Sequence, residues 1–311
     1  MKEELIMTIP ALYRDDFRVT GYRFGNGEKA ACIMGTMRGN EFQQLYVCQQ
    51  LISRLRTLEA EGAIRAGKQI LVIPCGNPYS INVKQRFWTI DNTDINRMFP
   101  GYSEGETTQR IADGIFKAIS GYQNGIQLAS FYMHGRFMPH IRVMKTGYED
   151  TDKARTFGLP YVVLHQPRPY DSATLNYNWQ IWGVKAFSLY TTSTEQVDPV
   201  GAQQGVEAIL QYLSCEGIID YNGFPGYISR IVDSGDMVTV RSSASGFFEQ
   251  LVAPGERVKK GQLMGRITHP YLGDATEQVI APVDGTVFFI HDDPMVYEAT
   301  SLIKMIPNSK G

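Results

Sequence analysis

A strand–helix–strand pattern over residues 29–73 constrains the fold more than any other feature of the chain. Residues 29–36 form a largely apolar run that ends next to Gly35, and residues 70–73 form a second run rich in β-branched side chains. The helix expected between them, over residues 40–61, presents one apolar face, made of Phe42, Leu45, Cys48, Ile52 and Leu55. Two strands joined through a helix form a βαβ unit, whose strands are parallel. The sequence therefore predicts an α/β fold.

Similar patterns continue this α/β domain to residue 222. A strand over residues 16–24 comes first, and Gly25-Asn26-Gly27 supplies a turn before the next strand. The other expected strands and helices cover residues 127–133, 161–164 and 186–190 (strands) and residues 106–119 and 200–213 (helices). Residues 1–222 are thus predicted to form one α/β domain.

Residues 223–311 differ in character, because short strand-like runs alternate with turn residues and no helix-length pattern remains. We expect a small all-β, barrel-like domain. Residues 252–267 and 279–288 are similar to the two halves of biotinyl/lipoyl barrels. Those carriers present a modified lysine between the halves, whereas this chain has no lysine between Lys260 and Lys304. We therefore expect the β domain to act as a lid over the site or as a contact surface in a homo-oligomer, and not as a carrier.

Composition excludes several classes of protein. With 311 residues, 43% hydrophobic and 20% charged, the chain is large enough for an extensive core. A net charge of -2 argues against a general nucleic-acid binder. We expect no membrane span and no signal peptide, since no apolar run approaches the necessary length. The four cysteines are scattered, which predicts free thiols in a reducing cytoplasm.

The segment 76–101 has the composition of a long loop and follows a predicted buried strand. It contributes Arg86, Asn96 and Arg97, and a guanidinium group can hold a carboxylate at two points. Asp91 and Asp94 could brace these arginines. A solvated loop with paired charges is the alternative. The position of this segment after a strand of an α/β sheet favours a binding site for a small carboxylate.

Two other predicted strand ends carry polar residues. Arg38-Gly39-Asn40-Glu41 opens the first helix, and His134 and His140 follow the strand over residues 127–133. A carboxylate and a histidine at one sheet edge could hold a zinc ion with a position open for water. Alternatively, the histidine is a hydrogen-bonded structural residue and Glu41 favours the helix N-terminus electrostatically.

The block Arg86…Asp94-Ile-Asn96-Arg97-Met-Phe-Pro-Gly101 resembles a block of the succinylglutamate desuccinylase/aspartoacylase family, relatives of the zinc carboxypeptidases. The resemblance extends over nearly the whole chain. It implies a mixed sheet flanked by helices, as in zinc carboxypeptidases, with a C-terminal β domain. It also implies that Arg86, Asn96 and Arg97 bind the substrate carboxylate and polarise the scissile carbonyl.

The resemblance also implies a zinc site, with departures. The family's His-Gly-x-Glu motif corresponds to Arg38-Gly39-Asn40-Glu41, so Arg38 occupies the slot of the first histidine. Glu41 remains as a ligand, and His134, or His140 in its place, supplies the third. A guanidinium has no lone pair for a metal. It would repel a cation by about 4 kcal/mol per unit charge at ~4 Å and an effective dielectric of about 20. Either zinc is lost, another residue takes over, or Arg38 turns away.

The family's catalytic glutamate, in a Thr-x-Glu pattern, corresponds to Tyr190 in this chain. Tyr190 could donate a hydrogen bond to an oxyanion, but a phenol with a pKa of about 10 is a poor base at neutral pH. Glu195 follows five residues later. It could act as the general base, or it could be an exposed loop carboxylate.

Two functions are compatible with these residues. The first is a metal-dependent hydrolase of the deacylase or carboxypeptidase type, which cleaves an amide or ester beside a carboxylate with Arg86 stabilising the oxyanion. The second is a non-catalytic binding protein for small carboxylates that has lost zinc, as the residues Arg38 and Tyr190 suggest.

Overall fold

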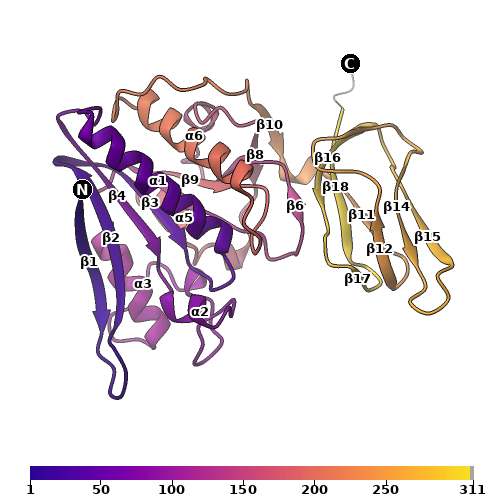
Figure 1. Ribbon diagram of the computed structural model, residues 1–311, viewed down its shortest axis with the longest axis horizontal. Coiled ribbons are helices and arrows are strands. Elements are labelled where there is room, and N and C mark those ends of the chain that lie inside the picture. The colour runs from indigo at the N-terminus through magenta and orange to yellow at the C-terminus, as the bar shows by residue number, and fades with distance from the viewer. Residues whose placement is uncertain (309–311) are drawn as a thin grey trace. The chain divides into compact units, whose positions relative to one another are not determined.

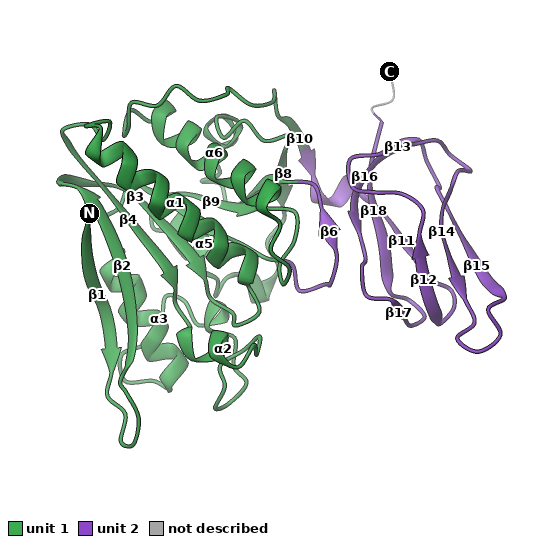
Figure 2. Cartoon of the chain, in the orientation of Figure 1, with its two compact units in different colours: residues 1–130, 139–231 green, residues 131–138, 232–311 purple. Residues whose placement is uncertain are grey.

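The computed structural model describes residues 1–308, which fold into two compact units (Figure 2). The first unit contains residues 1–130 and 139–231, and the second contains residues 131–138 and the chain from residue 232 onward. Across residues 1–308, no helix combines the length and the apolar character needed to cross a membrane.

A nine-stranded mixed sheet forms the first unit (Figure 1). From one edge to the other its strands are β1 (Lys2–Ile9), β2 (Phe17–Gly25), β4 (Gly67–Cys75), β3 (Gly27–Thr36), β5 (Asn124–Leu128), β9 (Lys185–Tyr190), β7 (His140–Met144), β8 (Tyr161–His165) and β10 (Arg230–Asp233). The central pairs β4–β3, β3–β5 and β5–β9 are parallel, whereas β2–β4 and β7–β9 are antiparallel. The predicted mixed sheet is confirmed.

The predicted βαβ unit is β3, α1 (Phe42–Ala60) and β4, with the two strands paired in parallel. Successive residues of β3 enter different cores, because side chains alternate between the faces of a strand. Ile33 packs in the same core as Leu51 of α1, and Cys32 belongs to the core on the other side. Both faces of the sheet are therefore buried, as expected for parallel strands.

Helices cover both faces of the sheet. α1 and α6 (Pro199–Cys215) contribute to one core, and α3 (Thr107–Ala118) and α5 (Leu175–Ile181) contribute to the other. The remaining helices of this unit are short, and they are α2 (Pro78–Asn82), η1 (Ile95–Arg97), α4 (Thr151–Arg155) and η2 (Pro169–Asp171).

The prediction of a strand over residues 127–133 is wrong at the C-terminal end of that strand. β5 stops at Leu128, and residues 131–138 belong to the second unit. There Phe131 packs against Phe137 and Phe289, with ring centroids 4.6 and 6.2 Å apart. Phe131 is half-buried in these contacts and Tyr132 is 75% exposed, so the apolar character of this run does not correspond to a buried strand.

The turn at Gly25-Asn26-Gly27 is present, but β2 and β3 do not pair with each other. β4 lies between them. Gly27 has a φ of +123°, and a Cβ there would lie 2.3 Å from the backbone oxygen of Gly67. Glycine allows this close passage of the chain.

Two antiparallel sheets form the second unit, so the all-β prediction is confirmed, although in the described chain these sheets form no closed barrel. One sheet contains β11 (Val238–Arg241), β18 (Ser301–Pro307), β16 (Gly285–Ile290), β13 (Arg257–Val258) and β6 (Arg136–Phe137). The other contains β15 (Ala275–Ile280), β14 (Leu263–Thr268), β12 (Gly246–Gln250) and β17 (Met295–Val296). η3 (Ser234–Asp236) precedes β11.

Candidate ligand-binding site

A polar cavity of about 40 Å³ lies in the first unit, next to the ends of β3, β5 and β9. Its walls come from the sheet, from the loop that contains η1, and from the segment that contains η2 and the start of α5. The lining residues are Arg38, Asn96, Arg97, Gln127, Ala129, Ser130, Arg142, Met144, Asp171, Thr174, Asn176, Ser188 and Tyr190. Ligands bind at such strand ends in many open α/β sheets.

Arg38 lies at this edge with its guanidinium between two carboxylates. Its Nε and Nη2 donate to Asp94 Oδ2 at 3.1 and 2.8 Å, and its Nη1 donates to Glu41 Oε1 at 3.1 Å. Burial lowers the pKa of Arg38, but the charges of Asp94 and Glu41 more than reverse this effect, and the pKa lies above its ordinary value. Arg38 is therefore a permanent cation that these two carboxylates neutralise.

The backbone around Arg38 depends on Gly39. A Cβ on Gly39 would lie 2.2 Å from the carbonyl oxygens of both Ser80 and Gln85. The Gly39 N–H also donates to the Arg86 carbonyl oxygen at 3.2 Å. Close contact between these two loop segments holds Arg38 at the site.

Both oxygens of Glu41 are engaged within the protein. Oε2 accepts hydrogen bonds from the N–H groups of Met37 and Arg38, and Oε1 accepts from Ser130 Oγ in addition to Arg38. The Glu41 side chain is only 2% exposed. This carboxylate serves as the counterion of Arg38.

The two histidines expected as metal ligands lie in different surroundings. His140 is buried in β7 and stacks on Tyr190, with ring centroids 4.6 Å apart and an interplanar angle of 5°. His134 belongs to the second unit, where its exposed side chain lies 3.9 Å from Asp293. His134 does not follow the end of β5 directly, because the strand over residues 127–133 is shorter than predicted.

These residues do not fit a zinc ion. Protein zinc sites combine several thiolate, imidazole or carboxylate ligands around one point. Within residues 1–308, no three His, Cys, Asp or Glu side chains are arranged to hold a metal ion. The first ligand position implied by the family resemblance holds the Arg38 cation, and the second, Glu41, is bound to it.

The predicted carboxylate clamp is only partly assembled at the cavity. Asn96 and Arg97 line it, whereas Arg86 does not. Asn96 Oδ1 accepts hydrogen bonds from Gln127 Nε2 at 3.1 Å and from the Leu175 N–H at 3.3 Å, which leaves its Nδ2 to donate to a ligand. Burial and the charge of Arg38 lower the pKa of Arg86, which is half-buried.

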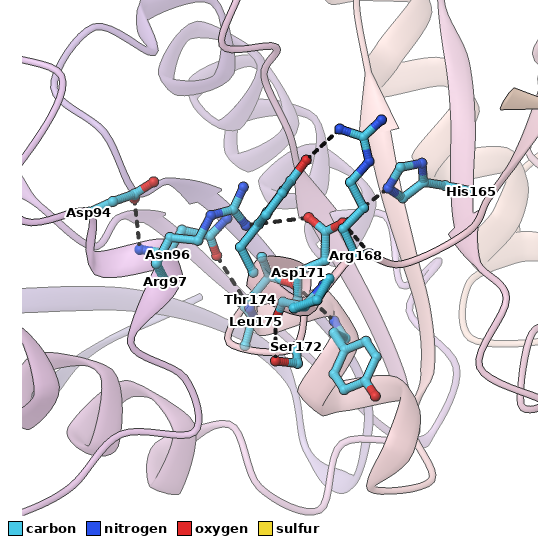
Figure 3. A network of polar contacts seen from close by, with 12 residues as sticks. Asp94, Asn96, Arg97, His165, Arg168, Asp171, Ser172, Thr174 and Leu175 are labelled. Atoms are coloured by element: carbon cyan, nitrogen blue, oxygen red, sulfur yellow. Dashed lines mark hydrogen bonds and ion pairs between the residues drawn. The ribbon is translucent and has the colours of Figure 1, made fainter. Parts of the chain in front are cut away.

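The carboxylates that pair with the arginines of this segment differ from the predicted ones, Asp91 and Asp94. Asp94 pairs with Arg38, and Asp91 accepts from the Thr93 N–H. Arg97 instead faces Asp171, at 3.7 Å from Nη1 to Oδ1 (Figure 3).

Tyr190 lines the cavity, but Glu195 does not. Burial raises the pKa of Tyr190, so its phenol remains protonated. The Arg142 guanidinium carbon lies 4.8 Å from the centre of the Tyr190 ring. Glu195 is exposed and accepts a hydrogen bond from Asn40 Nδ2 at 2.7 Å, and its charge acts on Arg86.

Arg142, Asp171 and Asn176 are among the lining residues that the sequence analysis did not assign to the site. Arg142 lies on β7, a short strand that was not predicted. Asp171 ends η2, and its Oδ2 accepts from the Arg168 N–H at 3.0 Å and lies 3.1 Å from His165 Nε2 (Figure 3). The short sequence separation between His165 and Asp171 was the sequence feature that could have indicated this part of the site.

Comparison with known proteins places the chain among deacylase relatives. It is 24% identical over 279 residues to N-alpha-acetyl-L-2,4-diaminobutyric acid deacetylase from Halomonas elongata, which covers 86% of this chain and 76% of the relative. Its fold matches a succinylglutamate desuccinylase from Silicibacter sp. TM1040 with a TM-score of 0.81 and 20% identity, over 97% of this chain and 93% of the other.

A product-bound ectoine utilization protein from Ruegeria pomeroyi matches with a TM-score of 0.80 and 19% identity, over 96% of this chain and 93% of the other. The model of the succinylglutamate desuccinylase/aspartoacylase catalytic domain matches residues 28–214, which is more than half of the chain. The resemblance found in the sequence is therefore confirmed, and this chain belongs to the succinylglutamate desuccinylase/aspartoacylase family.

Proposed function

We propose that this protein binds a small carboxylate-bearing molecule in the arginine-lined cavity without a zinc ion. The observation that carries the proposal is the position of the Arg38 guanidinium, which is bound by both Glu41 and Asp94. In this arrangement a permanent cation stands at the first metal-ligand position. The charge of Glu41 is already balanced, so no site for a divalent cation remains there.

Two other arginines are available for the ligand. Arg97 Nη1 lies 3.7 Å from Asp171 Oδ1, which is too long for a hydrogen bond. Arg142 has a buried Nε with no hydrogen-bond partner within residues 1–308. A carboxylate between these groups would supply the missing acceptor, since paired N–H donors of guanidinium match the two carboxylate oxygens.

The relatives' names indicate which carboxylates to test first. A deacetylase that acts on an N-acetylated amino acid and several proteins named desuccinylase or aspartoacylase are similar to this chain. We therefore infer that the ligand belongs to the N-acyl amino acids or their deacylated products.

Isothermal titration calorimetry with a panel of N-acyl and free amino acids tests this proposal. At least one ligand is expected to bind, and Arg97→Gln is expected to weaken it by about tenfold or more, because a charge-assisted hydrogen bond is lost. Arg65→Gln is the matched control, since Arg65 forms an exposed ion pair with Asp220. A panel in which nothing binds, or an Arg97→Gln variant that binds like the wild type, contradicts the proposal.

Amide or ester hydrolysis of the deacylase type is the second candidate, favoured by family membership. Glu195 and Arg86 interact electrostatically and could serve as base and oxyanion donor. The test is release of acetate or succinate from N-acyl amino acids, with and without added zinc. Turnover that depends on zinc and is lost in Glu41→Gln would support the zinc-dependent hydrolase over the binding protein.

A further inference from the structure

We propose that the first unit has a second ligand site, for an aryl carboxylate, in an apolar pocket beside the turn between β1 and β2 (Figure 1). The wall of this turn pocket combines that turn with Tyr79 of α2 and with Trp88 and Ile90 of the loop that follows α2. Among the described residues, none lines both the turn pocket and the arginine-lined cavity. The inference therefore goes beyond the proposed function and does not depend on it.

The turn pocket is large enough for a small organic molecule. Its volume is about 360 Å³, and pockets that bind ligands typically have volumes of roughly 300–1,000 Å³. Its lining is mostly apolar and partly open to water, since Leu12 is 92% exposed and Ile90 is 66% exposed. A ligand that covers this apolar surface would remove it from water, which is favourable.

Three aromatic rings form a fixed wall of the turn pocket. The Phe17 ring lies edge-on to the rings of Tyr79 and Trp88, with centroids 5.1 and 5.3 Å apart, and Tyr79 stacks on Trp88 at an interplanar angle of 16°. Tyr79 Oη also donates to the carbonyl oxygen of Asp15 at 2.6 Å, which ties α2 to the turn. An aryl group of a ligand can pack against such a wall without rearranging it.

Arg14 gives the turn pocket a positive charge. Its guanidinium carbon lies 4.3 Å from the centre of the Tyr79 ring, and Arg14 is the charged member of the lining among the described residues. Across residues 1–308 no carboxylate lies within ion-pair distance of Arg14, and the nearby Asp16 instead faces Arg18 at 3.9 Å. Guanidinium N–H groups pair well with the two oxygens of a carboxylate. A ligand with one carboxylate would therefore complement this charge.

Trp88 supplies a second, independent observation. Its side chain lines the turn pocket and is 2% exposed, and its Nε1 has no hydrogen-bond partner in the described part of the chain. Buried indole N–H groups usually have an acceptor. A ligand in the pocket could supply that acceptor after a small turn of the indole ring. Both unpaired groups, the guanidinium and the indole N–H, are donors, so they favour a ligand that carries acceptors.

Nuclear magnetic resonance of the ¹⁵N-labelled full chain tests the inference with three small molecules. They are 3-phenylpropanoate, its neutral amide and propanoate, which offer the ring and the charge, the ring alone and the charge alone. The signal of the Trp88 indole N–H, identified by its absence in Trp88→Phe, is expected to shift saturably with 3-phenylpropanoate. The amide and propanoate are each expected to bind about fivefold or more weakly. An unmoved Trp88 signal, or equal binding of the acid and the amide, overturns the inference.

Two substitutions of arginine assign the charge. Arg14→Gln is expected to reduce the preference for the acid over the amide to less than about twofold, whereas the matched control Arg18→Gln is expected to keep it. Arg97→Gln separates this pocket from the arginine-lined cavity, because it should leave the shift of the Trp88 signal unchanged. An unchanged preference in Arg14→Gln, or loss of the shift in Arg97→Gln, contradicts the assignment.

A second copy of the chain is the other occupant that the experiment must separate. Light scattering gives the mass of the wild type and of Leu12→Ser, which alters an exposed apolar residue of the pocket. Equal masses together with saturable binding of 3-phenylpropanoate support the ligand site. A dimer that Leu12→Ser dissociates, with no binding of the acid, assigns the turn pocket to a second copy and overturns the inference.

Discussion

Replacing Arg38 by methionine is expected to lower the free energy of unfolding of the first unit by about 3–5 kcal/mol. Three charge-assisted hydrogen bonds are lost, two to Asp94 and one to Glu41. The side chains of Arg38, Glu41 and Asp94 are 8%, 2% and 14% exposed, so water screens these interactions little. Methionine fills a similar volume, and the loss therefore measures two buried carboxylates left without their cation.

Urea unfolding followed by tryptophan fluorescence measures this loss, because Trp88, Trp179 and Trp182 all belong to the first unit. Arg65→Met is the matched control, since the ion pair of Arg65 is exposed and its loss should cost less than about 1 kcal/mol. If Arg38→Met destabilises the protein no more than Arg65→Met does, Arg38 is not the buried counterion of Glu41 and Asp94.

Three further predictions follow from individual contacts. The folded pKa of Asp171 lies below its ordinary value of 3.8, so its contribution to stability is complete above that value and disappears as the pH falls through the folded pKa. The difference in urea midpoint between wild type and Asp171→Asn should therefore vanish at strongly acidic pH, and a difference that persists there would contradict this. Gly39→Ala should destabilise the first unit by more than about 2 kcal/mol, since its Cβ would collide with the Ser80 and Gln85 carbonyl oxygens, and an unchanged urea midpoint would refute the close approach. Arg142→Gln should weaken carboxylate binding by about tenfold in calorimetry, and full affinity would remove Arg142 from the site.

The βαβ unit and the long helices could be predicted from sequence because their signals are local. The apolar periodicity of residues 40–61 and the β-branched run at residues 70–73 are enough to define α1 and β4. The run at residues 127–133 has a similar signal, but the half-buried Phe131 packs against Phe137 of the second unit. Periodicity reports burial and does not identify the partner, so the end of this strand could not be predicted.

The candidate site shows the same limit. Asn96 and Arg97 could be predicted because they lie in one distinctive block of sequence. Asp171 and Asn176 reach the same cavity through tertiary contacts such as the hydrogen bond from the Leu175 N–H to Asn96 Oδ1, which joins positions 79 residues apart in the sequence. Arg142 occupies one position of a short strand whose neighbours in the sheet come from distant segments. Such tertiary contacts leave no local pattern.

The central claim, that the Arg38 cation takes the place of a metal, is tested most directly by the zinc content of the protein. Purified protein is incubated with zinc, desalted and analysed for bound metal, and the binding of N-acetyl amino acids is then measured with and without a chelator. We predict less than about 0.1 equivalents of zinc and an affinity that the chelator does not change. About one equivalent of zinc, lost in Glu41→Gln together with ligand binding, would contradict the account.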